Sequence, residues 1–161
     1  MTADASGPMK LWPAAATINV GHAALTAPLR PPSHTQGTYG EMWQWIGDGR
    51  SLFSLLLVAR CDGEESTTGV RHRLLAEVER ISKPIVPCED ETVRTEIAIV
   101  AGARAAFVAH VDGIREGVPV RNLVTAAATY ERTYFLHVLV PDTQAGHEQA
   151  SSVASSLRLA G

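Results

Sequence analysis

The chain has 161 residues, of which 45% are hydrophobic and 19% are charged, and its formal net charge is -3. This composition excludes a disordered chain and a membrane span, and it disfavours bulk nucleic-acid binding, which needs a basic surface. At roughly 150 residues per domain, the length predicts one domain. Residues 1–16 are rich in Ala, Pro, Gly and Ser without any period. They predict a flexible N-terminal arm, followed by a single α+β domain over residues 17–161.

The first predicted strand begins at Thr17 and is stopped by Pro28. Every second residue of this segment is predicted to point to the same face, and small or polar residues lie between them, as in a half-buried strand. The residues of that face are Ile18, Val20, His22 and Ala24. Residues 29–40 contain Pro, Ser, Thr and Gly and are predicted to form a loop. Two apolar runs follow at residues 41–46 and 51–60, and the Gly-Asp-Gly between them predicts a β-hairpin.

A helix is predicted to begin at a capping residue between positions 66 and 68 and to end before Pro84. Its apolar stripe is Val70, Leu74, Val78 and Ile81. Four extended segments follow, each bounded by turn residues, at 92–100, 103–111, 118–129 and 133–140. Their short connections predict an antiparallel meander. After Pro141-Asp142-Thr143 a terminal helix is predicted, with the stripe Ala150, Val153, Ala154 and Leu157.

These elements predict an α+β domain with an antiparallel sheet of six or seven strands and two helices. The order of elements suggests that both helices cover one face of the sheet. No phosphate loop, dinucleotide fingerprint, nucleophile elbow or spaced metal-binding motif occurs in the sequence. We therefore predict no catalytic residue, no metal and no cofactor. The two cysteines, Cys61 and Cys88, and the lack of an apolar run near the N-terminus lead us to expect a cytoplasmic protein.

The segment Glu41-Met42-Trp43-Gln44-Trp45 is the first candidate for a binding site. Trp43 and Trp45 project from the same face of a predicted strand, where two indoles could form an apolar ledge for a partner or ligand. Met42, Trp43 and Trp45 are therefore the candidate binding residues. The alternative is that both indoles pack in the core beneath a helix.

A second hypothesis places a small-molecule binding or catalytic site in a pocket between the sheet and a helix. Three histidines lie on predicted strands: His22, His110 and His137. We expect His22 and His110 to face each other across the sheet, where a carboxylate such as Glu96 could join them. The alternative is that these histidines are solvated or hydrogen-bonded side chains of the sheet and bind nothing.

Several segments together suggest a family. An early strand runs into a proline at residues 24–28, an apolar strand at 53–58 precedes a helix, and a turn of small residues at 100–105 introduces the meander. The last strand leads through Val140-Pro141-Asp142 into a helix that ends in Ser-Leu-Arg-Leu at residues 156–159. In this order of elements the chain resembles the PsbP-like (Mog-type) superfamily, which includes DcrB-like proteins, LpqN-type lipoproteins and the Eag chaperones of type VI secretion.

The resemblance implies a PsbP-like α/β/α sandwich and a non-enzymatic adaptor or chaperone that binds another protein. It also implies a link to a secretion system or another larger assembly. The chain departs from the lipoproteins because it lacks an export signal, and from many relatives because Leu29-Arg30-Pro31 stands where they have a tryptophan. A protein partner is expected, without nucleic acid or a membrane span, and both a monomer and a homodimer remain open.

Overall fold

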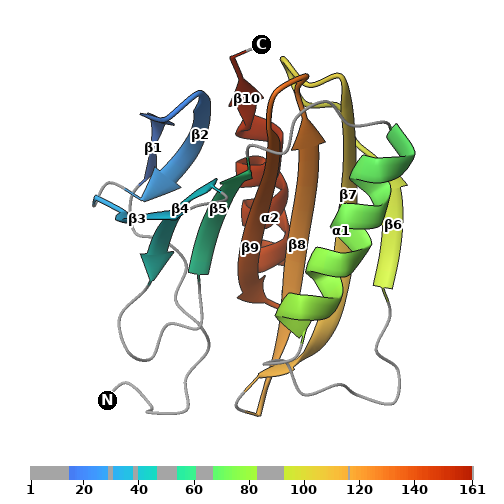
Figure 1. The fold of residues 1–161 in the computed structure, drawn as a ribbon. Helices are drawn as coiled ribbons and strands as arrows, with labels where there is room; N and C mark the ends of the chain where they lie inside the picture. Colours follow the sequence, from blue (N-terminus) through green and yellow to red (C-terminus); the bar gives the residue numbers. More distant parts are fainter. Residues whose placement is uncertain are drawn as a thin grey trace.

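The computed structural model describes residues 15–28, 31–37, 40–46, 54–60, 67–82, 93–115 and 117–160. Their strands form two sheets (Figure 1). The larger sheet has the order β3-β4-β5-β9-β8-β7-β6, and the smaller one the order β1-β2-β10. The predicted arm lies outside the described residues except for Ala15 and Ala16, which belong to β1.

The larger sheet comprises β3 (Ser33–Gly37), β4 (Gly40–Ile46), β5 (Ser54–Arg60), β6 (Val93–Ile97), β7 (Ala105–Arg115), β8 (Val118–Ala128) and β9 (Thr133–Pro141). The smaller sheet comprises β1 (Ala15–Val20), β2 (Ala23–Pro28) and β10 (Arg158–Leu159). The helices are α1 (Thr67–Ser82) and α2 (Gln144–Ser156). The α+β class and the seven-stranded antiparallel sheet are as predicted.

The antiparallel meander is confirmed. Strands β6, β7, β8 and β9 pair in chain order, each antiparallel to the next. The β4–β5 hairpin is also confirmed by its antiparallel register, although its predicted Gly-Asp-Gly turn lies outside the described residues. In the chain order, α1 connects β5, near the middle of the sheet, to β6 at its edge.

The two helices pack on opposite faces of the sheet, so the expectation that both cover one face was wrong. Strand β9 shows this directly, because its successive side chains point to opposite faces. Phe135 belongs to the buried cluster beneath α1, whereas Leu136 belongs to the cluster that includes α2. Figure 1 shows α1 in front of the larger sheet and α2 behind it. Element order alone does not determine which face a helix covers, since that depends on the direction of each crossover.

The first predicted strand is in fact a hairpin. β1 and β2 pair antiparallel on either side of Gly21 and His22, and Gly21 has a φ of 55°. A two-residue turn at this point reverses the chain and shifts the phase of the inward-facing residues. The buried residues of β2 are Ala23, Leu25, Ala27 and Pro28, and Ala24 is only partly buried. The alternation in the sequence continues through the turn, which is why the reversal was missed.

Two short strands also differ from prediction. β3 lies in the stretch that was predicted to be a loop, and every one of its residues is exposed. An exposed edge strand without apolar residues has no periodic signal to detect. β10 follows α2 directly, where the terminal helix was expected to continue, and pairs with β2.

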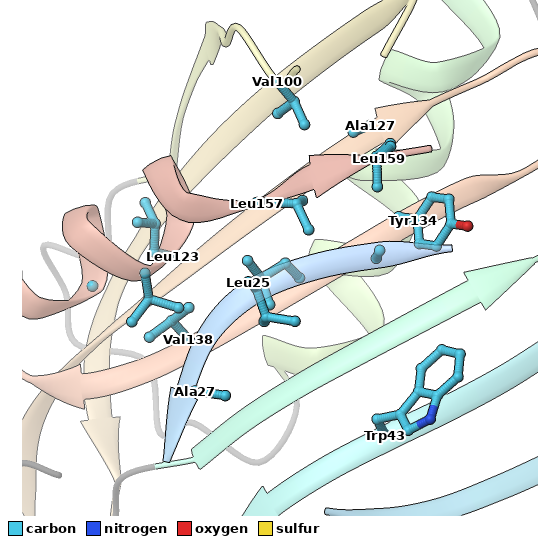
Figure 2. Close-up of a cluster of buried hydrophobic side chains, with 14 of the residues drawn as sticks. Leu25, Ala27, Trp43, Val100, Leu123, Ala127, Tyr134, Val138, Leu157 and Leu159 are labelled. Atoms are coloured by element: carbon cyan, nitrogen blue, oxygen red, sulfur yellow. The ribbon is translucent and has the colours of Figure 1, made fainter. Parts of the chain in front are cut away.

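The main core lies between the smaller sheet, the larger sheet and α2. Figure 2 shows its side chains converging from β2, β8, β9 and the segment after α2. A second cluster lies beneath α1, where Val70, Leu74 and Val78 face the sheet as predicted; the side chain of Ile81 lies outside the described part. Neither helix in the described residues is long and apolar enough to cross a membrane.

Candidate functional site

A groove opens on the face of the larger sheet that carries α2. The helix packs against β8, β9 and β2, so β7 and β6 extend beyond it. The resulting hollow has a volume of about 240 Å³. Its floor is made by Val108, His110, Leu123 and Thr125 of β7 and β8. One wall is made by Ser151, Ala154 and Ser155 of α2, and the other by residues 96–100.

The edge segment that forms the outer wall of the groove also carries exposed apolar side chains. Ile97 is 81% exposed and Ile99 is 98% exposed. Ile97 ends β6, which is the last strand of the larger sheet in the described part of the chain, and Ile99 lies two residues beyond it. Val93, at the other end of β6, is 46% exposed. Ile97 pairs with Phe107, which belongs to the cluster beneath α1, so the side chain of Ile97 points to the face opposite the floor of the groove.

His110 and Glu96 form a pair at the rim of the groove. The Nε2 atom of His110 lies 2.8 Å from Oε1 of Glu96, and the two side chains are 18% and 64% exposed. The other ring nitrogen, Nδ1, is buried and has no hydrogen-bond partner among the described residues. The accessible nitrogen is therefore already bonded to the carboxylate, and the free one is inaccessible.

A salt bridge lies next to His110, between Asp112 of β7 and Arg121 of β8. Asp112 accepts two hydrogen bonds from the guanidinium of Arg121, from Nε at 2.6 Å and from Nη2 at 3.0 Å. These bonds hold the pKa of Asp112 below its usual value, and the partial burial of the carboxylate opposes them. The bidentate geometry fixes both side chains to the strands that carry them.

The predicted trio of His22, His110 and Glu96 does not exist, because only the last two meet. His22 is an exposed turn residue rather than a strand residue. His137 lies beneath α1 on the opposite face of the sheet from His110, with its Nε2 3.4 Å from Oε1 of Glu77. The three histidines thus occupy three separate environments. No group of three potential metal ligands comes together within the described ranges.

The buried pair beneath α1 is electrostatically stabilised. Glu77 and His137 are 3% and 5% exposed. Burial raises the pKa of Glu77, but hydrogen bonds from His137 and Arg80 outweigh it and lower the pKa from 4.5 to about 2. A buried carboxylate needs such partners to remain charged. This cluster attaches α1 to β9 and opens into no groove that the structure describes.

The tryptophan ledge is corrected by the structure. Trp43 and Trp45 share a face of β4 as predicted, but they are only 6% and 2% exposed and belong to the main core. The imidazole of His34 stacks on Trp43 with 5.1 Å between ring centroids. Met42 is partly buried. These residues follow the core-packing alternative, because the smaller sheet covers the face from which the indoles project.

Of the residues that line the groove, Glu96 and His110 were candidates from the sequence and the others were not. The alternation of residues 92–100 is the same in a buried and an exposed strand, so it does not indicate that this segment borders a groove. Ser151 and Ser155 of α2 carry no motif. Their importance depends on where α2 lies over the sheet, and this placement is set by long-range packing.

No protein-family model and no curated protein matches the sequence. Solved structures do match the fold. Cyanobacterial PsbP (CyanoP) from Synechocystis sp. PCC 6803 is 10% identical, with a TM-score of 0.55 and coverage of 99% of this chain and 98% of CyanoP. PA94, a protein of unknown function from Pseudomonas aeruginosa, is 12% identical, with a TM-score of 0.46 and coverage of 85% and 90%. At such identities the likeness concerns the fold alone, and the match to CyanoP shows that this chain has a PsbP-like fold.

Proposed function

We propose that this protein is a non-enzymatic adaptor or chaperone, and that the groove beside α2 receives apolar side chains from a segment of its protein partner. The observation that carries the proposal is the groove, whose floor includes Val108 and Leu123, beside an edge segment on which Ile97 and Ile99 are 81% and 98% exposed. Apolar side chains of this size gain from removal from water, and a partner segment with apolar residues supplies the complementary surface.

The dimensions of the groove favour a protein segment over a small molecule. Its volume of about 240 Å³ is below the roughly 300–1,000 Å³ of typical small-molecule sites. Ser151 and Ser155 lie on one rim and Glu96 on the other, and the floor between them combines apolar Val108 and Leu123 with polar His110 and Thr125. Protein interfaces commonly combine apolar and polar groups in this way, with a polar rim.

The state of His110 favours binding over catalysis. A general base must present a free nitrogen within hydrogen-bond reach of the substrate. In His110 the nitrogen at the groove rim is bonded to Glu96, and Nδ1 is buried. The pair therefore supports the alternative of a histidine-dependent enzyme only weakly, and we assign it a structural role at the rim.

The proposal is tested by selecting peptides from a displayed random library against the wild-type protein and measuring their affinity for two variants. Ser155→Trp adds a large side chain to the groove wall, whereas Ser152→Trp places the same side chain on α2 outside the groove. Both serines are exposed, so both variants should fold. We expect selected peptides to be rich in apolar residues and to bind S155W at least about tenfold more weakly, with S152W unchanged.

Equal affinity for wild type and S155W would contradict the assignment of the groove. A library that yields no binding peptide would contradict peptide recognition itself. In the first case, backbone amide chemical shifts of the wild-type protein, recorded with each selected peptide, would show which other surface responds.

A further inference from the structure

We propose that two copies of this chain associate through their β6 strands, antiparallel and related by a two-fold axis through Thr95. The two larger sheets would then form one continuous sheet. The inference does not rest on the groove or on its partner. It rests on the direction of the backbone groups of β6, on the order of its five side chains, and on their exposure.

The backbone of β6 offers hydrogen-bonding groups on its outer edge. The N–H of Ala98, just after the strand, donates to the carbonyl of Ala106 at 3.0 Å and so continues the β6–β7 ladder. In an antiparallel ladder the residues alternate between pairs that exchange hydrogen bonds and pairs that do not. Glu96 and Arg94 therefore direct their backbone groups toward β7, as Ala98 does. The intervening residues, Val93, Thr95 and Ile97, direct theirs outward.

The sequence of β6 is self-complementary about Thr95. It reads Val-Arg-Thr-Glu-Ile from residue 93 to 97. Antiparallel pairing of two copies about Thr95 places Val93 of each copy opposite Ile97 of the other. It likewise places Arg94 of each copy opposite Glu96 of the other. The outward backbone groups of Val93, Thr95 and Ile97 then meet the equivalent groups of the second copy.

The charges of Arg94 and Glu96 favour the pairing centred on Thr95 over pairings shifted by one residue. A pairing centred on Arg94 or on Glu96 would place two like charges directly opposite each other, which is destabilising. Arg94 is exposed and makes no ion pair with any described residue. At longer range, its positive charge contributes to the lowered pKa of Asp112. Glu96 is 64% exposed and uses Oε1 for His110. Its Oε2 atom is therefore available to an arginine of the second copy.

Apolar burial favours this edge over the other edge of the sheet. Val93 and Ile97 are 46% and 81% exposed, and pairing would bring them together across the interface. The opposite edge, β3, consists of Ser, His, Thr, Gln and Gly and offers no apolar side chain. A two-fold interface is isologous, so each favourable contact occurs twice. Paired residues of antiparallel strands point to the same face, and both grooves would consequently open on one face of the dimer.

A charge-exchange experiment tests the proposal. The mass of wild type, Arg94→Glu, Glu96→Arg and the double variant R94E/E96R is followed by sedimentation equilibrium over a range of protein and salt concentrations. The interface is small, so a weak and concentration-dependent wild-type dimer is expected. Each single variant places like charges opposite each other and should weaken dimerisation by about tenfold or more. The double variant restores opposite charges and should dimerise like wild type.

Mixing the two single variants provides the most specific readout. An R94E copy and an E96R copy are complementary to each other at both charge pairs, so the mixture should form a heterodimer more tightly than either variant forms its own homodimer. Gln36→Arg, which adds a charge to the exposed β3 edge, is the matched control and should leave the wild-type dimer unchanged. Far-UV circular dichroism verifies that every variant is folded. A monomeric wild type, or single variants that dimerise as wild type does, would overturn the proposal.

Discussion

Gly102 is the residue at which the meander meets the C-terminal strand. Its φ is 86°, and a Cβ atom built on it would lie 1.8 Å from the carbonyl oxygen of Leu159. The neighbouring Ala101 accepts a hydrogen bond of 2.8 Å from the N–H of Leu159. Two requirements therefore coincide at this position, a left-handed backbone and a close approach of two chain segments, and glycine alone satisfies both.

Gly102→Ala should be clearly more destabilising than Gly117→Ala. Gly117 also has a positive φ, of 78°, but a Cβ atom there would meet nothing within 4 Å. The strain of a left-handed alanine, about 1–2 kcal/mol, is common to both variants. The difference between their free energies of unfolding in urea thus measures the Leu159 contact. An equal loss of unfolding free energy in the two variants would mean that β10 moves away from residue 102 without a cost in free energy.

At the scale of residues, one part of the predicted trio comes together and the other does not. Glu96 and His110 lie on neighbouring strands of the meander and meet, whereas His22, which was expected to face His110, is an exposed turn residue. That His137 points to the other face depends on the exact register of β7, β8 and β9. A shift of one residue in any of these strands would exchange the two faces. No local pattern determines that register to a single residue.

At the scale of elements, the segments with strong periodicity were predicted well. The helix α1 and the strands β7, β8 and β9 have long apolar patterns and short connections, so their existence and order follow from local signals. β3 has no apolar residue, and β10 is only two residues long. β3 pairs with β4 and β10 pairs with β2, and the tertiary fold determines both pairings, which strand propensity does not predict.

The attachment of α1 to the sheet leads to a prediction about pH. Burial raises the pKa of Glu77, but His137 and Arg80 together lower it from 4.5 to about 2 in the folded protein. The folded-state pKa lies below the unfolded value, so the stabilisation is fully present above pH 4.5 and is lost as the pH falls toward 2. Glu77→Gln should therefore cost about 2–3 kcal/mol of unfolding free energy at neutral pH, and progressively less below pH 4.5.

The control for this experiment is Glu79→Gln on the same helix, where the side chain is exposed. Urea unfolding at a series of pH values gives the free energy for wild type and for both variants. E79Q should follow the wild-type curve within the usual small effect of a surface substitution. If the loss of unfolding free energy in E77Q did not change with pH, packing rather than the charge of Glu77 would attach α1 to the sheet.

At the scale of the whole molecule, one core joins the two sheets. Leu157 lies between α2 and β10 and is 2% exposed, within a cluster that also contains Leu25 of β2 and Val138 of β9 (Figure 2). The smaller sheet has three strands, and its buried face is completed by residues of the larger sheet and of α2. Neither sheet has a separate core on this side, so both should unfold together.

Leu157→Ala should destabilise the molecule by about 2–5 kcal/mol without separating the unfolding of the two sheets. The fluorescence of the buried Trp43 and Trp45, measured in a Trp12→Phe background, reports on the main core, and far-UV circular dichroism reports on all elements. The two urea transitions should coincide before and after the substitution, because the shared core makes unfolding cooperative. Leu75→Ala removes the same atoms from a side chain that is 38% exposed and should cost much less. A fluorescence transition that precedes the circular dichroism transition in L157A would instead show that the smaller sheet and its core can open while the meander and α1 stay folded.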